Sequence, residues 1–169
     1  DYPARLKEVD DHPPVLYVRG DLLPEDEWGI AVVGTRRATP YGRQAAEHFS
    51  TDLARQRITI VSGLARGVDA IAHRAALNAG GRTIAVLACG LDIVYPPEHA
   101  RLAAEISQHG ALVSDYPLGT QPRSEYFPRR NRILSALSLG VLVIECDVDS
   151  GALITARNAI DQNREVFAV

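Results

Sequence analysis

Methionine, lysine and cysteine are scarce in this chain of 169 residues, and each scarcity excludes something. Methionine is absent altogether, so the chain lacks a start residue of its own, and we interpret it as a fragment of a longer protein. Long hydrophobic runs are absent too, since none approaches the roughly 18 residues that span a membrane. The polar N-terminus carries no signal peptide. Together these absences predict a cytoplasmic protein that does not enter a membrane.

Cysteine occurs only twice, at Cys89 and Cys146, each after an apolar, strand-like run. No Cys-x-x-Cys or Cys/His spacing indicates a metal site, and two cysteines make a thin disulfide framework. We therefore expect two reduced, buried thiols. Asp147 and Asp149 stand two apart with no third ligand nearby, so we expect them to cap a helix or to be solvated, and we expect no metal.

Lysine occurs once, as Lys7, and the rest of the 18 basic residues are arginine. The formal net charge of −3 argues mildly against nucleic acid, but the distribution of charge matters more than its sum. Two arginines are adjacent at 36–37, and three fall within 129–132. Because the planar guanidinium pairs with phosphate and stacks on bases better than an ammonium does, these clusters favour an anionic ligand.

Hydrophobic residues make up 46% of the chain and recur in blocks that predict strands and helices in turn. Strands that are apolar on both faces need cover on both sides. The pattern therefore predicts a doubly wound, mainly parallel sheet, an extended Rossmann-like α/β fold in three α/β/α layers. Residues 1–24 are expected to form a lead-in with a short strand, and residues 25–169 the Rossmann-like domain. The expected strands are 15–18, 30–33, 58–61, 83–87, 111–113, 141–144 and 165–169, and the expected helices are 40–56, 68–79, 97–109, 128–138 and 152–162.

Ligands of such sheets bind beyond the carboxyl ends of the strands, so the loops there are candidate sites. The first such loop begins with Gly34, Thr35 and Arg36, between a buried strand and a helix start. Exposed N–H groups and the positive end of the helix dipole would make it an anion site, with Gly34 allowing close approach and Arg36 adding charge. The alternative is a simple turn with two solvated arginines.

A second glycine-rich turn runs through Ser62, Gly63 and Arg66 into a helix, and it favours the same anion-binding interpretation. Asp69 and His73 lie four apart on that helix. We expect them to form an ion pair or a polar contact that holds the loop, because a catalytic pair would lack a nucleophile. Neither loop is a nucleotide fingerprint, since the chain has no P-loop and no G-x-G-x-x-G after the first strand. A dinucleotide-binding enzyme would also need Asp or Glu for the ribose hydroxyls at the position of Ser62, so no cofactor is expected.

The segment around Phe127 is the most informative for function, because it combines aromatic residues with arginines. The turn at Tyr95 indicates structure more than chemistry. Tyr126 and Phe127 come just before the arginine cluster at 129–132. Pro128 suits the first position of a helix, which would put the arginines in a first turn, where they oppose the helix dipole unless an anion binds. Aromatic rings beside arginines suit a single nucleic-acid strand, whose bases stack and whose phosphates pair with guanidinium. The alternative is a surface helix with solvated arginines and core aromatics.

Five motifs, taken in order, resemble the DNA-processing protein A (DprA/Smf) family from about Val15 onward. They are GTRRATPYG, SGLARGVDAIAH, CGLDIVYPPEH, FPRRNRILSALS and SGALITARNA. The resemblance implies an extended Rossmann-like domain that binds single-stranded DNA in a basic pocket and has no established catalytic activity. It also implies homodimers, and delivery of the DNA to the RecA recombinase during natural transformation. Many members carry an N-terminal helical domain and a C-terminal winged-helix domain, and we expect neither in this chain.

The resemblance also assigns roles by position. Arg36 matches the arginine of the first loop motif, and Phe127 is the expected contact for a base. One position departs from the family, because Ser124 stands where members often have a pocket lysine, and Arg123 beside it is the candidate substitute. No catalytic residue is expected. The full set of expected DNA- or phosphate-binding residues is Gly34, Thr35, Arg36, Ser62, Gly63, Arg66, Arg123, Phe127, Arg130, Asn131 and Arg132.

Two other interpretations stay open. One is a nucleotide phosphoribohydrolase of the lysine-decarboxylase-like Rossmann family, which carries a PGGxGTxxE segment. Residues 117–120 followed by Glu125 imitate that segment poorly, since the second glycine pair is missing and the spacing fails. The other is a nucleotide-binding carrier without catalysis. Release of free adenine from AMP would separate the enzyme from a DNA-binding protein.

Overall fold

The computed structural model describes residues 2–148 and 150–169, and a seven-stranded sheet forms its centre. The strand order is β1-β5-β4-β3-β2-β6-β7, and every neighbouring pair is parallel except β1 with β5. The strands are β1 (Tyr17–Gly20), β2 (Gly29–Val33), β3 (Thr59–Ser62), β4 (Thr83–Val86), β5 (Gly110–Ser114), β6 (Gly140–Val143) and β7 (Glu165–Ala168). The helices are α1 (Ala4–Lys7), α2 (Pro40–Arg55), α3 (Val68–Asn78), α4 (Ala100–His109), α5 (Tyr126–Ala136) and α6 (Gly151–Asp161), with short 3₁₀ helices η1 (Pro24–Glu27) and η2 (Pro97–His99).

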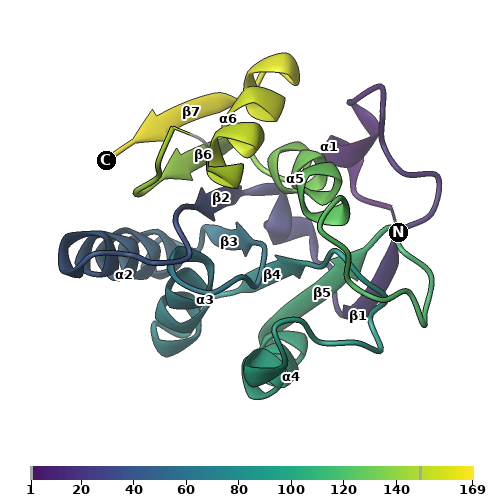
Figure 1. The fold of residues 1–169 in the computed structure, drawn as a ribbon, viewed down its shortest axis with the longest axis horizontal. Helices are drawn as coiled ribbons and strands as arrows, with labels where there is room; N and C mark the ends of the chain where they lie inside the picture. The colour runs from purple at the N-terminus through teal and green to yellow at the C-terminus, as the bar shows by residue number, and fades with distance from the viewer. Residues whose placement is uncertain (1, 149) are drawn as a thin grey trace.

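Helices cover both faces of this sheet. Figure 1 shows α2, α3 and α4 along one face and α1, α5 and α6 along the other. Alternation along β2 explains the division, because Ala31 and Val33 join the core under α5 and α6, whereas Val32 joins the core under α2 and α3. The expected doubly wound, Rossmann-like fold in three layers is therefore confirmed. Within the described residues, no helix combines the length and the apolar character needed to cross a bilayer.

The chain changes direction across the sheet between β2 and β6. From β2 the chain adds β3, β4 and β5 in turn on one side, and then returns to place β6 and β7 on the other. The loops after β2 and β6 therefore leave the same edge of the sheet toward opposite faces. Such a topological switch point opens a crevice at the carboxyl ends of the two strands, which is where doubly wound folds bind their ligands.

The N-terminal lead-in packs against the same central sheet. Its strand β1 lies two residues later than expected and runs antiparallel to β5, with Tyr17 opposite Ser114. The short helices α1 and η1 were not expected from the sequence. Leu6 and Val9 are buried in the core that α5 and α6 also cover, so apolar contacts hold this segment against the sheet.

Helix α5 begins earlier than its proline suggested. Its first residue is Tyr126, so Pro128 is the third residue and not the first. Proline is tolerated there because the N–H groups of a first turn have no partner within the helix. Arg130 consequently lies in the second turn, and the expectation that it opposes the dipole of a first turn is wrong. Asp149, one of the two acids considered for a metal, lies outside the described residues.

Candidate functional site

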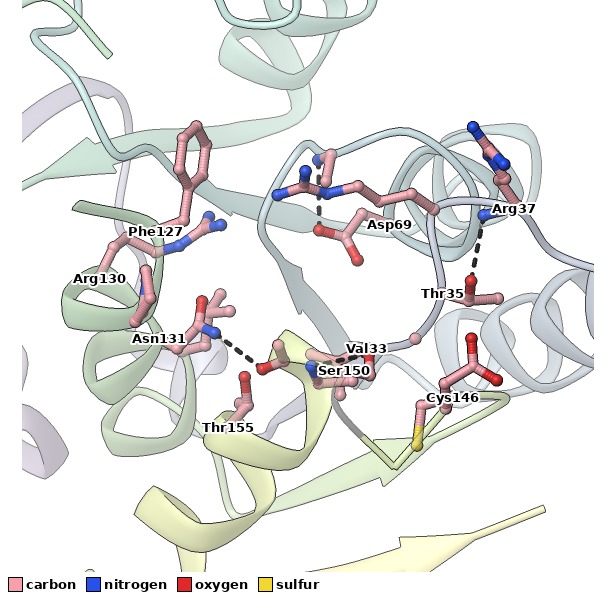
Figure 2. Close-up of a pocket in the computed structure, with 18 of the residues that line it drawn as sticks. Val33, Thr35, Arg37, Asp69, Phe127, Arg130, Asn131, Cys146, Ser150 and Thr155 are labelled. Atoms are coloured by element: carbon pink, nitrogen blue, oxygen red, sulfur yellow. Dashed lines mark hydrogen bonds between the residues drawn. The ribbon is translucent and has the colours of Figure 1, made fainter. Parts of the chain in front are cut away.

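A cleft of about 1340 Å³ opens at the carboxyl ends of β2 and β6, at the switch point. Three segments form most of its lining: the loop from β2 to α2, residues 122–124 with the start of α5, and the loop from β6 with the start of α6. Ala65, Asp69 and Tyr95 complete it. Figure 2 shows Phe127 and Arg130 on α5, across the opening from the loop that carries Thr35 and Arg37. Segments more than 100 residues apart in the chain thus form one cavity.

Aromatic rings and guanidinium groups lie against each other at the rim of the cleft. The guanidinium carbon of Arg36 lies 5.5 Å from the centre of the Phe127 ring. The ring of Tyr95 also lies beside Phe127, with 5.5 Å between the ring centres and 53° between the ring planes. The guanidinium of Arg123 lies 5.9 Å from the ring centre of Tyr126 in the same wall. These distances permit cation–π attraction and leave flat, polarisable surfaces at the mouth of the cleft.

The floor of the cleft holds a second kind of arginine. Arg130 is only 4% exposed, and its Nη1 donates hydrogen bonds to the carbonyls of Gly63, at 2.9 Å, and Val86. Asp69 lies nearby, and its Oδ2 accepts from the backbone N–H groups of Gly63, at 3.1 Å, and Ala65, at 3.2 Å. Burial raises the pKa of Asp69 and lowers the pKa of Arg130, and the opposite charge of each partner offsets part of that shift. Each buried charge therefore depends on the other.

Three backbone N–H groups in the loop after β2 donate hydrogen bonds to acceptors within the protein itself. The N–H of Thr35 donates to the carbonyl of Glu145 at 2.7 Å, and the N–H of Arg37 donates to Oγ1 of Thr35 at 3.2 Å. The N–H and the hydroxyl of Thr39 both donate to Oε2 of Glu145, each at 3.1 Å. The expectation that free turn amides would hold an anion here is therefore wrong for these three N–H groups. The positive charge of this loop comes from the side chains of Arg36 and Arg37.

The structure brings seven of the eleven expected site residues to the cleft. Among them, Asn131 is 92% buried, since its exposed fraction is 8%, and its Nδ2 donates to the carbonyl of Gly151 at 3.1 Å. This bond ties the cleft wall of α5 to the first residue of α6. Ser124, where the resemblance led us to expect a lysine, also lines the cleft, with Arg123 beside it. The seven are Gly34, Thr35, Arg36, Arg123, Phe127, Arg130 and Asn131.

Two expected residues of the second loop serve the fold instead. Ser62 is fully buried, and its hydroxyl donates to the carbonyl of Val32 at 2.6 Å. Gly63 gives its N–H to Asp69, and a Cβ on Gly63 would lie 2.5 Å from the guanidinium nitrogens of Arg130. Glycine is needed at position 63 so that the buried arginine can pass, and neither residue lines the cleft.

Two expected arginines also lie outside the cleft lining because acids hold them elsewhere. Arg66 pairs with Glu98, with Nε 2.6 Å from Oε1. Arg132 pairs with Asp115, with Nη2 2.8 Å from Oδ2, and more loosely with Asp11 at 3.7 Å. Partners so far away in the sequence could not be paired with these arginines by spacing alone.

Several features of the cleft were missed or misjudged from the sequence. The turn at Tyr95 was expected to serve structure more than chemistry, yet Tyr95 lines the cleft against Phe127. His73 does not pair with Asp69, because its Nδ1 lies 2.6 Å from Oγ1 of Thr83 on the neighbouring strand. The cysteines are both free, as expected, but Cys146 is only half-buried and lines the cleft.

Fold and cleft together define a class: a Rossmann-like α/β domain whose switch-point cleft presents arginines and aromatic rings instead of a nucleotide fingerprint. The family model described as DNA recombination-mediator protein A matches residues 1–169. The chain is 50% identical over 169 residues to Protein Smf of Escherichia coli, and 46% identical over 169 residues to DNA processing protein DprA of Bacillus subtilis. The chain belongs to the DNA recombination-mediator protein A family, which includes DprA and Smf.

Solved structures of two relatives match the fold closely. DNA processing protein A of Streptococcus pneumoniae superposes with a TM-score of 0.90 at 41% identity, over 99% of this chain and 59% of that one. The Helicobacter pylori protein also gives 0.90, at 34% identity, over 99% of this chain and 77% of that one. A molybdenum cofactor binding protein of Rippkaea orientalis, at 20% identity and a TM-score of 0.61 over 83% of this chain and 74% of its own, shares the fold alone.

The chain accounts for only part of its relatives. The matches cover 99% of this chain, but 45% of the Escherichia coli protein and 57% of the Bacillus subtilis protein. The activity and partners of those whole proteins are therefore matters of proposal for this chain.

Proposed function

We propose that this chain binds single-stranded DNA in the switch-point cleft, without reading its sequence and without cutting it. Family membership supports the proposal, as does the Helicobacter pylori relative, whose structure is described as revealing a unique mode of single-stranded DNA binding. The observation that carries it is the rim, where Arg36 and Tyr95 both lie beside the ring of Phe127. Arginine supplies the charge that a phosphate needs, and the rings supply the faces on which bases stack.

The rim favours a single strand over a duplex. Phe127 and Tyr95 present ring faces within a concave cleft, and only an unpaired base can leave its own stack to lie on them. Phosphate contacts from Arg36, Arg37 and Arg123 would position the strand without depending on its sequence. Arg123, which lines the cleft beside Ser124, would take the role of the pocket lysine that the family resemblance implies.

The finer parts of the proposal rest on the family resemblance. In the full-length protein, the domain works as a homodimer in the cytoplasm and hands bound DNA to the RecA recombinase during natural transformation. The chain supplies the DNA-binding cleft for that process, and no catalytic step is assigned to it.

Fluorescence anisotropy with labelled oligo-dT tests the proposal. We expect tighter binding to the oligonucleotide than to a duplex of equal length, and an affinity that falls with salt at a slope of about −0.7 per phosphate contact. Arg36→Ala should weaken binding, whereas Arg55→Ala should not, because Arg55 is equally charged but lies at the far end of α2 beside Asp52. An affinity independent of salt, or equal for both forms of DNA, would contradict the proposal. The oligonucleotide should also stay intact on a denaturing gel.

A further inference from the structure

Glu145 occupies a place where Rossmann-like proteins usually bind a phosphate. It is the second residue after β6, and its side chain crosses the switch point to the beginning of α2. The N-terminus of the helix beside a switch point offers free N–H groups and a positive dipole end, which is why pyrophosphates bind there in dinucleotide-binding relatives of this fold. In this chain a carboxylate from the protein itself is already present.

The side chain of Glu145 makes close contacts with the start of α2. Its Oε2 accepts both the N–H and the hydroxyl of Thr39, the residue that caps α2, each at 3.1 Å. Gly42, in the first turn of α2, lies so close to the same oxygen that a Cβ on Gly42 would collide with it. The N–H and the hydroxyl of the residue that caps α2 therefore point at a carboxylate, and Gly42 makes room for it.

A phosphate could not share this place with Glu145. Two anions a few ångströms apart repel each other, and the N–H and hydroxyl of Thr39 that would compensate are already bonded to Glu145. The guanidinium groups of Arg36 and Arg123 lie at the rim, against the rings of Phe127 and Tyr126. Phosphate groups are thereby directed away from α2 and toward the rim.

We propose that Glu145 is a specificity-determining residue that closes the α2 N-terminus to phosphate, so that compact pyrophosphate-bearing molecules such as nucleoside diphosphates and dinucleotides are excluded from the cleft. Removing its side chain opens a phosphate subsite formed by the donors of Thr39 and the start of α2. The exclusion of pyrophosphates stands on geometry alone. Its consequence, that the cleft prefers a phosphodiester chain held at the rim, rests on the proposed function.

Asp147 provides a matched control. It lines the same cleft and carries the same charge, but its side chain is exposed and no hydrogen bond joins it to α2 within the described part of the chain. Asp147→Ala therefore changes the net charge of the cleft as Glu145→Ala does, without uncovering the helix start. A comparison of the two variants separates a local opening from a general electrostatic effect.

Isothermal titration calorimetry with inorganic pyrophosphate tests the proposal on the whole 169-residue chain. We expect Glu145→Ala to bind pyrophosphate at least tenfold more tightly than the wild type, and Asp147→Ala to change the affinity less than threefold. Glu145→Ser is the second variant if the alanine variant does not fold, because serine is neutral and polar and is too short to cover the donors of Thr39. An unchanged pyrophosphate affinity in the folded variant, or an equal gain in Asp147→Ala, would overturn the proposal.

Oligo-dT binding, measured on the same variants, keeps the two proposals apart. If the wild type binds no oligo-dT, the proposed function fails, while the pyrophosphate result still decides the role of Glu145. If oligo-dT binds but Glu145→Ala gains no pyrophosphate affinity, only the exclusion role fails. If both hold, pyrophosphate should compete with oligo-dT more effectively in Glu145→Ala than in the wild type.

Discussion

The floor and the rim of the cleft use the same residue type for different purposes. On the floor, Arg130 is buried, bonded to backbone carbonyls and balanced by Asp69. At the rim, Arg36 lies on the face of Phe127, where its charge is available to a ligand. The floor arginine shapes the cleft, and the rim arginine can bind what enters it. Changes on the floor should therefore reduce stability, and changes at the rim should reduce affinity.

The largest expected effect is on the floor. Arg130→Ala leaves Asp69 buried without its counter-charge, so we expect the free energy of unfolding to fall by about 3–5 kcal/mol. Urea unfolding followed by circular dichroism measures the loss. Arg36→Ala serves as the comparison and should unfold like the wild type. A fully stable Arg130→Ala protein that has lost only its affinity for oligo-dT would place Arg130 with the rim.

A smaller effect is expected from the ring at the rim. Phe127→Ala should weaken oligo-dT binding by about 1–3 kcal/mol, because a base loses the surface on which it stacks. Anisotropy titrations give the affinity, and the stability of the variant should be near that of the wild type. Phe49→Ala is the matched control, since Phe49 lies on α2 and does not line the cleft. Equal affinities for both variants would remove Phe127 from the binding surface.

The burial of His73 on α3 also predicts a pH effect on stability. Burial lowers the pKa of His73 to about 3, below the 6.5 of an exposed histidine, so the unfolded chain binds the proton more readily than the folded protein. Stability is therefore complete above pH 6.5 and is lost as the pH falls toward 3, by about 2 kcal/mol between pH 6.5 and 4.5. Urea unfolding at both values should show this dependence in the wild type and not in His73→Gln. The same slope in both proteins would show that another group carries it.

The smallest effect is expected for Arg66, an arginine that lies neither on the floor nor at the rim of the cleft. Arg66 is exposed and paired with Glu98 outside the cleft lining, so Arg66→Ala should change oligo-dT affinity less than twofold at moderate salt. Arg36→Ala in the same assay should show a clear loss. If Arg66→Ala weakens binding as much as Arg36→Ala does, the DNA extends beyond the rim toward η2.

The elements of the fold could be predicted because each depends on a short stretch of sequence. Buried strands such as Ile30–Val33 are apolar throughout, and the helix that begins at Pro40 has its cap directly before it, so local pattern was sufficient. Arg36 and Phe127 were found for the same reason, since each belongs to a distinctive local motif. The strand order was not predicted, because it depends on pairings between distant segments.

The partners of the charged residues could not be predicted. Nothing near Arg132 in the sequence indicates that Asp115 would neutralise it, and nothing near Thr39 points to Glu145, which is 106 residues away. Tyr95 was missed because it reaches Phe127 only after the chain has folded. A sequence shows which groups are present, but three-dimensional packing decides which of them are already paired and which remain available for a ligand.

The position of β6 between β2 and β7 has a consequence for synthesis of the protein. Because β6 and the loop after it supply one wall of the cleft, a growing chain that has produced only β1 to β5 has no such cavity. Domains form as their segments emerge from the ribosome, N-terminal parts first. The cavity is therefore completed only after β6 and the loop that follows it have been made, and a chain that ends at β5 lacks the wall that carries Glu145 and Cys146.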